Sequence, residues 1–331
     1  MLSVGCLAMA CIALAVSGNE DGRELIPDTR FENGFTAFAP ELGQKVPIGT
    51  LSWNDAQPDW GLAQWASRMP LDGSEGPIQP EPDKHVFEND AKRVVVTRPG
   101  EADALLTLDV NAEVEYIDGP REGHEPWVHL LIEQRMDAPP ALPELERLDF
   151  QVEVRLRHCE KIPHDNYDPN RHAAQFVLFF TVQNLNRESS GYGDFYWFGV
   201  ALFDDRGLSD DEWSMHDRGT DKLMYRAPRS VYTTDPMEPG RWVRYEADIL
   251  PHVLAGLETA WELGYLGDSQ DVADYHIGGM NMGWEIPGVF NAGMDARKLS
   301  LRAVMPVADQ ETARAPAWSC ISNPNASIKG D

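Results

Sequence analysis

Carboxylate, imidazole and amide side chains recur at every second position in segments that read as β-strands. Asn281 and Glu285 fall on one face of 274–290, and His129 and Glu133 share a face of 126–136. Because successive side chains of a strand point to opposite sides, this spacing brings reactive groups together. Acid–base cleavage of a glycosidic bond requires such carboxyl groups, and nearby aromatic bulk raises a carboxyl pKa by desolvation.

Within an otherwise apolar strand, a histidine and a glutamate need partners if they are buried. His129 and Glu133 therefore form either a structural polar network or an acid–base pair. We favour Glu285 acting together with Glu133. The candidate catalytic residues are Glu285, Glu133, Glu153 and His129.

Two further segments each carry one strongly polar face. In 148–157 the polar set includes Glu153 and Arg155, and in 241–250 it includes Glu246 and Asp248. This pattern is typical of half-exposed antiparallel strands, whose outer faces carry cross-strand ion pairs. The functional alternative is that these faces line a shared concave groove.

The segment 194–205, DFYWFGVALFDD, is apolar on both faces, which predicts a central strand. Aromatic rings beside amides, carboxylates and guanidinium groups are what sugar recognition requires, because sugar C–H faces stack on rings and hydroxyls bind polar groups. The alternative is a core strand buried on both sides. The candidate substrate-binding residues are Trp197, Tyr196, Asn281, Arg155, Glu246 and Asp248.

Glycines occupy positions in 274–290 where a strand normally carries bulk. Gly279 and Gly283 share the face of Glu285, and glycine within a strand marks a bulge or a close approach of ligand or backbone. We expect them to make room over a groove floor, so that Asn281 and Glu285 reach into the groove. A bulge near the helix that follows Pro251 is the alternative.

Many short alternating segments with turn signals between them predict an all-β antiparallel sandwich of the jelly-roll type. One amphipathic helix is expected after Pro251, with Gly264 at its C-terminal cap. We expect one domain over 24–310, loop-rich in 24–90, a signal peptide over 1–17 and a loosely held tail over 311–331.

The 331 residues carry a net charge of −26, which disfavours nucleic acid and anionic membranes as partners. A neutral glycan is the favoured partner, and the signal segment predicts secretion or an exterior envelope location. No basic residue precedes its apolar run, so a different start or a lipid anchor at Cys6 or Cys11 stays open. No cofactor is expected, although the acidic loops 165–170 and 204–213 could hold a structural calcium ion. Cys159 and Cys320 either form one disulfide or remain two thiols.

Four quoted segments resemble uncharacterised secreted carbohydrate-active proteins with a concanavalin-A-like jelly roll: PDWGLAQWASRMPL, GPREGHEPWVHLLIEQ, GRWVRYEADILPHVLAGLETAWELGYL and DYHIGGMNMGWEIPG. The resemblance covers most of the chain after Phe31. It implies the sandwich fold and glycan recognition. That fold hosts lectins, binding modules, hydrolases and lyases, so it does not select an activity. The strand motif with two carboxylates of some sandwich glycosidases has only an approximate counterpart here, YEAD, so the resemblance transfers no catalytic role.

Glycoside hydrolysis with a carboxylate pair is the first hypothesis, since a sandwich of this size can build a walled cleft. Non-catalytic carbohydrate binding on the same face is the second. A polysaccharide lyase, with Tyr196 or His129 as base and Arg155 neutralising charge, is an alternative. A structural or cell-surface interaction protein without sugar specificity also remains open.

Overall fold

The computed structural model describes residues 22–306, with the exception of a single side chain. The predicted signal peptide over 1–17, the tail over 311–331 and Cys320 therefore lie outside the described residues. Within the described part Cys159 is a free thiol, and burial raises its pKa to about 12. None of the helices in 22–306 is long and apolar enough to cross a membrane.

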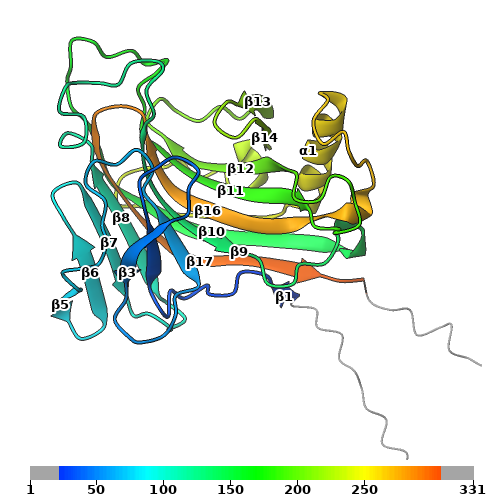
Figure 1. Cartoon of the computed structure of the whole chain (residues 1–331), viewed down its shortest axis with the longest axis horizontal. Helices are drawn as coiled ribbons and strands as arrows, with labels where there is room; N and C mark the ends of the chain where they lie inside the picture. Colours follow the sequence, from blue (N-terminus) through cyan, green and yellow to red (C-terminus); the bar gives the residue numbers. More distant parts are fainter. Residues whose placement is uncertain (1–21, 307–331) are drawn as a thin grey trace, which may run out of the picture. The chain divides into compact units, whose positions relative to one another are not determined.

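Two mainly antiparallel sheets confirm the predicted all-β sandwich, and Figure 1 shows them as stacked, curved layers. Sheet A has the order β15-β10-β17-β8-β7-β6-β5, with β1 paired to β17. Its strands are β1 (Arg23–Glu24), β5 (Ile78–Glu81), β6 (Lys84–Glu88), β7 (Lys92–Thr97), β8 (Leu105–Asn111), β10 (Arg147–Lys161), β15 (Trp242–Asp248) and β17 (Phe290–Val304).

Sheet B has the order β13-β14-β12-β11-β16-β9-β4-β2-β3. Two pairs of neighbouring strands in this sheet run parallel: β12 with β14, and β2 with β4. Its strands are β2 (Phe35–Phe38), β3 (Pro47–Leu51), β4 (Trp60–Ala63), β9 (Val128–Arg135), β11 (Gln175–Asn184), β12 (Phe195–Asp204), β13 (Trp213–Asp217), β14 (Lys222–Arg226) and β16 (Tyr275–Ile286).

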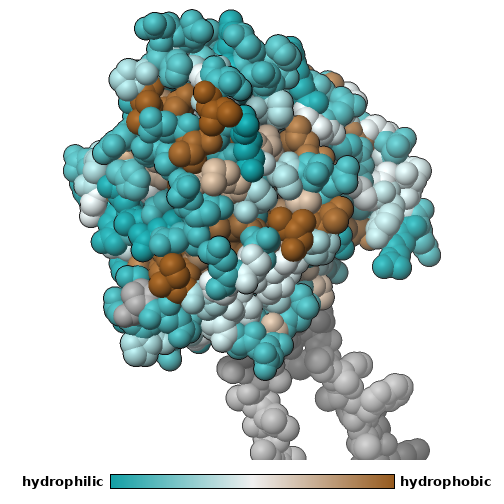
Figure 2. All heavy atoms as spheres, turned by 60° about the vertical axis from the view of Figure 1, so that its left-hand side comes forward, coloured by the Kyte–Doolittle hydropathy of each residue, from teal (hydrophilic) through white to brown (hydrophobic). Residues whose placement is uncertain are grey.

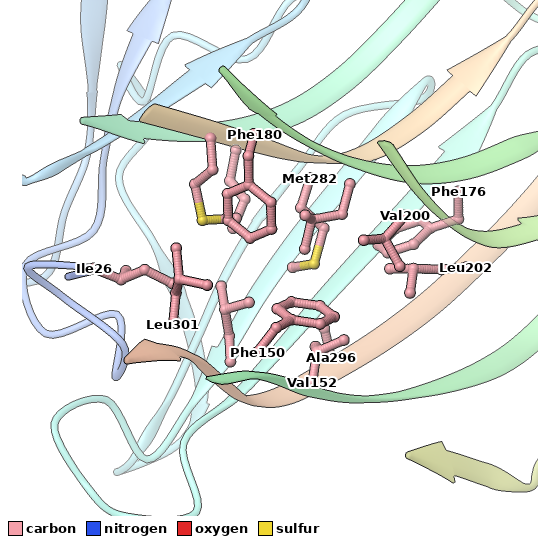
Figure 3. Close-up of a cluster of buried hydrophobic side chains, with 14 of the residues drawn as sticks. Ile26, Phe150, Val152, Phe176, Phe180, Val200, Leu202, Met282, Ala296 and Leu301 are labelled. Carbon is pink, nitrogen blue, oxygen red and sulfur yellow. The ribbon is translucent and has the colours of Figure 1, made fainter. Parts of the chain in front are cut away.

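The core lies between the two sheets, as Figure 3 shows. Phe150 of β10 packs edge-to-face against Phe180 of β11, with ring centroids 5.7 Å apart, and Met282 of β16 lies beside them. Alternate residues of β10 point into this core, as the sequence pattern predicts: Leu148, Phe150, Val152, Val154 and Leu156. The residues between them therefore face away from sheet B.

The predicted helix is α1 (Leu250–Glu262), and it packs against β12, β14 and β10 near one edge of the sandwich. Its buried stripe includes Val253, Leu257 and Ala260. Gly264 follows with a φ of +84°, which is the left-handed conformation that glycine accepts at a helix end. The short 3-10 helices are η1 (Leu142–Glu144), η2 (Arg229–Val231) and η3 (Val272–Asp274).

Two glycines of β16 allow the irregular pairing of this strand with its neighbours. The register against β11 shifts between Thr181 and Val182, so Gly278 is an extra residue in a bulge, and both Tyr275 and Ile277 join the core side. At Gly283, with a φ of +152°, an added Cβ would lie 2.1 Å from the main-chain oxygen of Leu130 on β9. The expectation that these glycines make room for a ligand is therefore corrected: Gly283 admits the neighbouring backbone.

Candidate functional site

The outer face of sheet B carries a group of aromatic rings beside polar side chains. The ring of Trp197 on β12 lies 6.0 Å from Phe179 on β11 and 4.9 Å from Phe195, centroid to centroid. The indole N–H of Trp197 donates to Oγ1 of Thr220 at 3.1 Å, which holds the ring in place. All three rings are partly exposed, so they offer an apolar surface that sugar C–H groups can cover. We call Phe179, Phe195 and Trp197 the aromatic platform.

Asn281 lies next to this platform. The register places it opposite Phe179 of β11 on one side and opposite Glu133 of β9 on the other. Its side chain is 8% exposed, and its Oδ1 has no hydrogen-bond partner. A buried amide oxygen without a donor is costly, so this side chain is held at the site for a reason other than its own hydrogen bonding.

Glu285 lies further along β16, directly opposite His129 of β9 and Gln175 of β11. The indole N–H of Trp127 donates to Oε2 of Glu285 at 3.3 Å. The ring of Trp127 also stacks on the imidazole of His129, with centroids 5.6 Å apart. Trp127 therefore supplies aromatic bulk beside Glu285, one of the two carboxyl groups for which the sequence analysis favours a catalytic role.

His129 is 7% exposed and held by its neighbours. Its Nδ1 lies 2.7 Å from the carbonyl oxygen of Trp127, so Nδ1 carries a proton and donates. Burial lowers the pKa of His129, and the negative charge of Glu285 opposes that effect only in part. The imidazole is therefore neutral at neutral pH and positions Trp127 beside Glu285.

The lowered pKa of His129 makes folding sensitive to acid. In the unfolded chain the imidazole binds a proton below about pH 6.5, whereas the folded protein resists that proton, so stability is present above this pH and is lost as the pH falls. We expect His129→Phe to reduce the fall in the free energy of unfolding between pH 7.5 and 5, by up to about 1.4 kcal/mol per pH unit. Denaturant unfolding between pH 7.5 and 5 measures it, with His216→Gln at an exposed site as the control. An unchanged pH slope in His129→Phe would contradict the neutral assignment.

Glu133 faces the same side of sheet B but lies apart from Glu285. Since His129 opposes Glu285, Glu133 is four residues further along β9, about 14 Å by strand geometry. Oε1 of Glu133 pairs with Nζ of Lys45 at 2.6 Å, and Glu285 leans towards Trp127 at the opposite end of β9. Opposed carboxyl groups of glycosidases lie roughly 5 to 10 Å apart. The preferred pairing of Glu285 with Glu133 is therefore not assembled.

Four of the candidates lie on the other sheet, so no single groove contains all of them. Glu153 and Arg155 face outward from β10 of sheet A. Glu153 pairs with Arg297 at 2.7 Å and Lys298 at 2.8 Å. Arg155 pairs with Asp295 at 2.6 Å and stacks on Trp242. Glu153 and Arg155 thus belong to a polar outer face with cross-strand ion pairs, which is one of the two interpretations given in the sequence analysis.

Glu246 and Asp248 also face outward, from β15. Glu246 pairs with Arg244 at 2.8 Å, and Oδ1 of Asp248 accepts the main-chain N–H groups of Leu148 and Leu250. Both line a polar depression of about 660 Å³ on the outer face of sheet A. These two hydrogen bonds connect Asp248 to the main chain of β10 and of the first residue of α1, which is a structural role.

Tyr196 is corrected as a substrate contact. Its side chain is fully buried on the core side of β12, and its hydroxyl donates to the carbonyl oxygen of Val253 in α1. The sequence analysis correctly placed Tyr196 and Trp197 on opposite faces of this strand, but the face that carries Tyr196 is the one that packs against α1. A lyase base at this position is excluded by the same burial.

Sequence reasoning missed Phe179, Lys45 and Arg121, whose guanidinium carbon lies 5.0 Å from the ring centroid of Trp127. Phe179 lies in 173–184, where Gln175, Thr181 and Gln183 mark one face as partly polar. That alternation is the signal that could have identified Phe179 as outward-facing. Lys45 and Arg121 come from loops, where no periodicity applies.

No group of three or more His, Cys, Asp or Glu side chains within 22–306 is arranged to hold a metal ion. The loops 165–170 and 204–213 are included in that range. Asp204 instead pairs with Arg206 at 2.7 Å, and Asp168 pairs with Arg171 at 3.2 Å.

No family model and no curated protein matches this chain. Among solved structures, it is similar to endoglucanase Cel12A from Rhodothermus marinus, with 12% identity, a TM-score of 0.37, and coverage of 68% of this chain and 93% of that one. It is also similar to a family 12 xyloglucanase from Bacillus licheniformis, with 9% identity, a TM-score of 0.36, and coverage of 67% and 93%. A third similar structure is a family 11 xylanase from Neocallimastix patriciarum, with 6% identity, a TM-score of 0.34, and coverage of 66% of this chain and 90% of that one. The assignment of the fold rests on the two sheets themselves.

Proposed function

We propose that the protein recognises a glycan along the outer face of sheet B. The observation that carries this proposal is the aromatic platform of Phe179, Phe195 and Trp197 beside Asn281, whose buried amide oxygen has no partner. Rings that stack on sugar faces and polar groups that bind hydroxyls are the two components of sugar recognition.

Charge supports a largely neutral glycan as the ligand. The net charge of −26 repels polyanions at long range, whereas an uncharged sugar chain experiences no such repulsion. Figure 2 shows a mostly hydrophilic surface on one side of the molecule, with separate hydrophobic patches. Export through the segment 1–17 belongs to this proposal, because polymeric glycans are met outside the cell.

Cleavage of the glycan at Glu285 is the second candidate function. It is favoured by Glu285 itself, a carboxyl group on the same face, held by Trp127 and next to the buried, neutral His129. The separation of Glu133 from Glu285 removes the expected carboxylate partner and favours binding over hydrolysis. A lyase that uses Arg155 is disfavoured, because Arg155 lies on sheet A.

Trp197→Ala tests the binding proposal. We expect glycan affinity to fall at least about tenfold, because a central aromatic anchor contributes more than about 1.4 kcal/mol. Retention on a panel of immobilised polysaccharides measures the effect. The matched control is Trp242→Ala on the outer face of sheet A, where the ring stacks on Arg155 and Arg297.

Equal retention by Trp197→Ala and wild type would overturn the proposal, as would equal losses in both tryptophan variants. A glycan array without any wild-type binding would favour an interaction protein with no sugar specificity. Thermal unfolding of each variant shows whether the fold is intact.

A further inference from the structure

A tryptophan and an arginine extend the outer face of sheet B beyond the aromatic platform, at the β13 edge. Trp213 of β13 pairs with Arg226 of β14, and Arg226 pairs with Gly199 of β12. Gly199 pairs in turn with Phe179, which lies opposite Asn281. These five residues therefore form one row that crosses the sheet. The proposed function uses only the end of this row that holds Phe179 and Asn281.

The surface that connects the platform to the β13 edge is apolar. Leu223 and Tyr225 of β14 are buried in the core, so the residues between and after them face outward. One of these is Met224, which pairs with Trp197 of the platform and with Met215 of β13. Met215 is 47% exposed. The apolar surface of the aromatic platform therefore continues as far as the edge strand.

Trp213 offers an indole ring at the surface, and Arg226 orients this ring. Trp213 is 37% exposed, and the guanidinium carbon of Arg226 lies 5.3 Å from its ring centroid. A cation over an indole restricts the ring, which lowers the entropy lost when a ligand binds to it. Trp213 thus combines exposure with a defined orientation, which are the two properties that a sugar-stacking ring needs.

The hydrogen-bond donors of Arg226 are unused. Its side-chain nitrogens form no hydrogen bond or ion pair with residues 22–306, and each of them reaches the surface. Asp204, whose negative charge acts on Arg226, already accepts two hydrogen bonds from Arg206 and one from Gln175. Burial lowers the pKa of Arg226, so its N–H groups are partly desolvated and gain from acceptors such as sugar hydroxyls.

The hairpin of β13 and β14 is tied to the platform. Its turn, 218–221, contains Thr220, whose hydroxyl accepts the indole N–H of Trp197 at 3.1 Å and donates to Asp217 at 2.5 Å. Oδ1 of Asp217 also accepts the main-chain N–H of Gly219 at 2.9 Å. Contacts within the protein therefore set the position of Trp213 relative to Trp197, so a ligand that touches both rings does not have to order them.

We propose that Trp213 and Arg226 form a second sugar-binding subsite, in which the indole stacks on a sugar ring and the guanidinium donates hydrogen bonds to its hydroxyls. This inference rests on the proposed glycan-binding function. Trp213 lies four strand intervals from Asn281, about 19 Å measured along the sheet, so a glycan that contacts both contains several linked sugars. The ligand class is therefore an oligosaccharide or a polysaccharide rather than a single sugar.

Oligosaccharides of increasing length test this subsite. They are prepared, from disaccharide to octasaccharide, from a polysaccharide that wild type retains, and calorimetry measures the affinity of the full chain for each. We expect wild-type affinity to rise once the sugar chain is long enough to reach Trp213. Trp213→Ala should lower the affinity for the octasaccharide about tenfold and leave that for the disaccharide within about twofold. Arg226→Gln should lower the octasaccharide affinity about threefold to tenfold.

The matched control is His216→Ala, which removes a ring from the opposite face of the same strand, where His216 contacts Tyr265. It should change no affinity in the series. Unchanged disaccharide affinity shows that a variant is folded. Octasaccharide affinity at the wild-type level in Trp213→Ala, or equal losses at every length, would overturn the inference. Failure of wild type to retain any polysaccharide would instead overturn the proposed function.

Discussion

Replacing Glu285 by glutamine is expected to lower sugar release between about a hundredfold and ten-thousandfold, while glycan retention stays within about twofold. The amide has nearly the same shape and can still accept the hydrogen bond from Trp127 at its Oε1. It cannot give up or take a proton in the reaction. Reducing-end release from a retained polysaccharide measures the activity, and pull-down on the same polysaccharide measures retention.

The control for this change is Glu246→Gln, which removes a carboxylate from the outer face of sheet A. It should leave both readouts unchanged. If wild type retains a glycan but releases no sugar from any substrate, the hydrolase candidate fails and the binding function remains. If Glu285→Gln releases sugar at the wild-type rate, the carboxyl group of Glu285 takes no part.

Replacing Glu115 by glutamine is expected to lower the free energy of unfolding by about 3 to 5 kcal/mol, because a buried charge is left without its partner. Glu115 and Lys92 form an ion pair whose side chains are both fully buried. Glu115 also accepts the hydroxyl of Ser67 at 2.8 Å and the main-chain N–H of Arg68 at 2.6 Å. These contacts tie two loops to β7.

Urea unfolding monitored by tryptophan fluorescence measures this loss. Glu113→Gln, an exposed glutamate two residues earlier, is the matched control and should change stability by less than about 0.5 kcal/mol. A Lys92→Met/Glu115→Gln double variant should be more stable than Glu115→Gln alone, since the unpaired charge is gone. A loss below about 1 kcal/mol in Glu115→Gln would show that the pair is not buried as described.

The strands were predictable wherever one face is buried and the other is polar. Along β10 the alternation of Phe150 and Val152 with Glu153 and Arg155 gave the inner and outer faces without error. Burial of one face fixes the register of a strand, so the pattern survives in the sequence. The helix after Pro251 was predictable for the same reason, with Gly264 as its end signal.

The grouping of the candidate residues was not predictable. A period of two tells which side of a strand a residue occupies, but it does not tell which sheet the strand joins. Glu153 and Glu285 both point outward, yet from opposite sides of the sandwich. The apposition of His129 with Glu285 depends on strand pairing between residues far apart in the chain.

Local irregularity explains the remaining differences. The bulge at Gly278 shifts the alternation of β16 by one residue, so Tyr275 and Ile277 share the core with Met280. Tyr196 has the same polar tip as a sugar-binding tyrosine, and only the packing of α1 shows that its hydroxyl is already used. Contacts from loops, such as Lys45 with Glu133, leave no periodic signal.

A crystal structure of the protein soaked with an oligosaccharide that it retains tests the central claim most directly. We predict sugar density across the outer face of sheet B, with a ring stacked on Trp197, a hydroxyl within hydrogen-bond distance of the side-chain amide of Asn281, and the chain running towards Glu285. Sugar density in the depression on sheet A, beside Glu246 and Asp248, with none on sheet B, would contradict the claim.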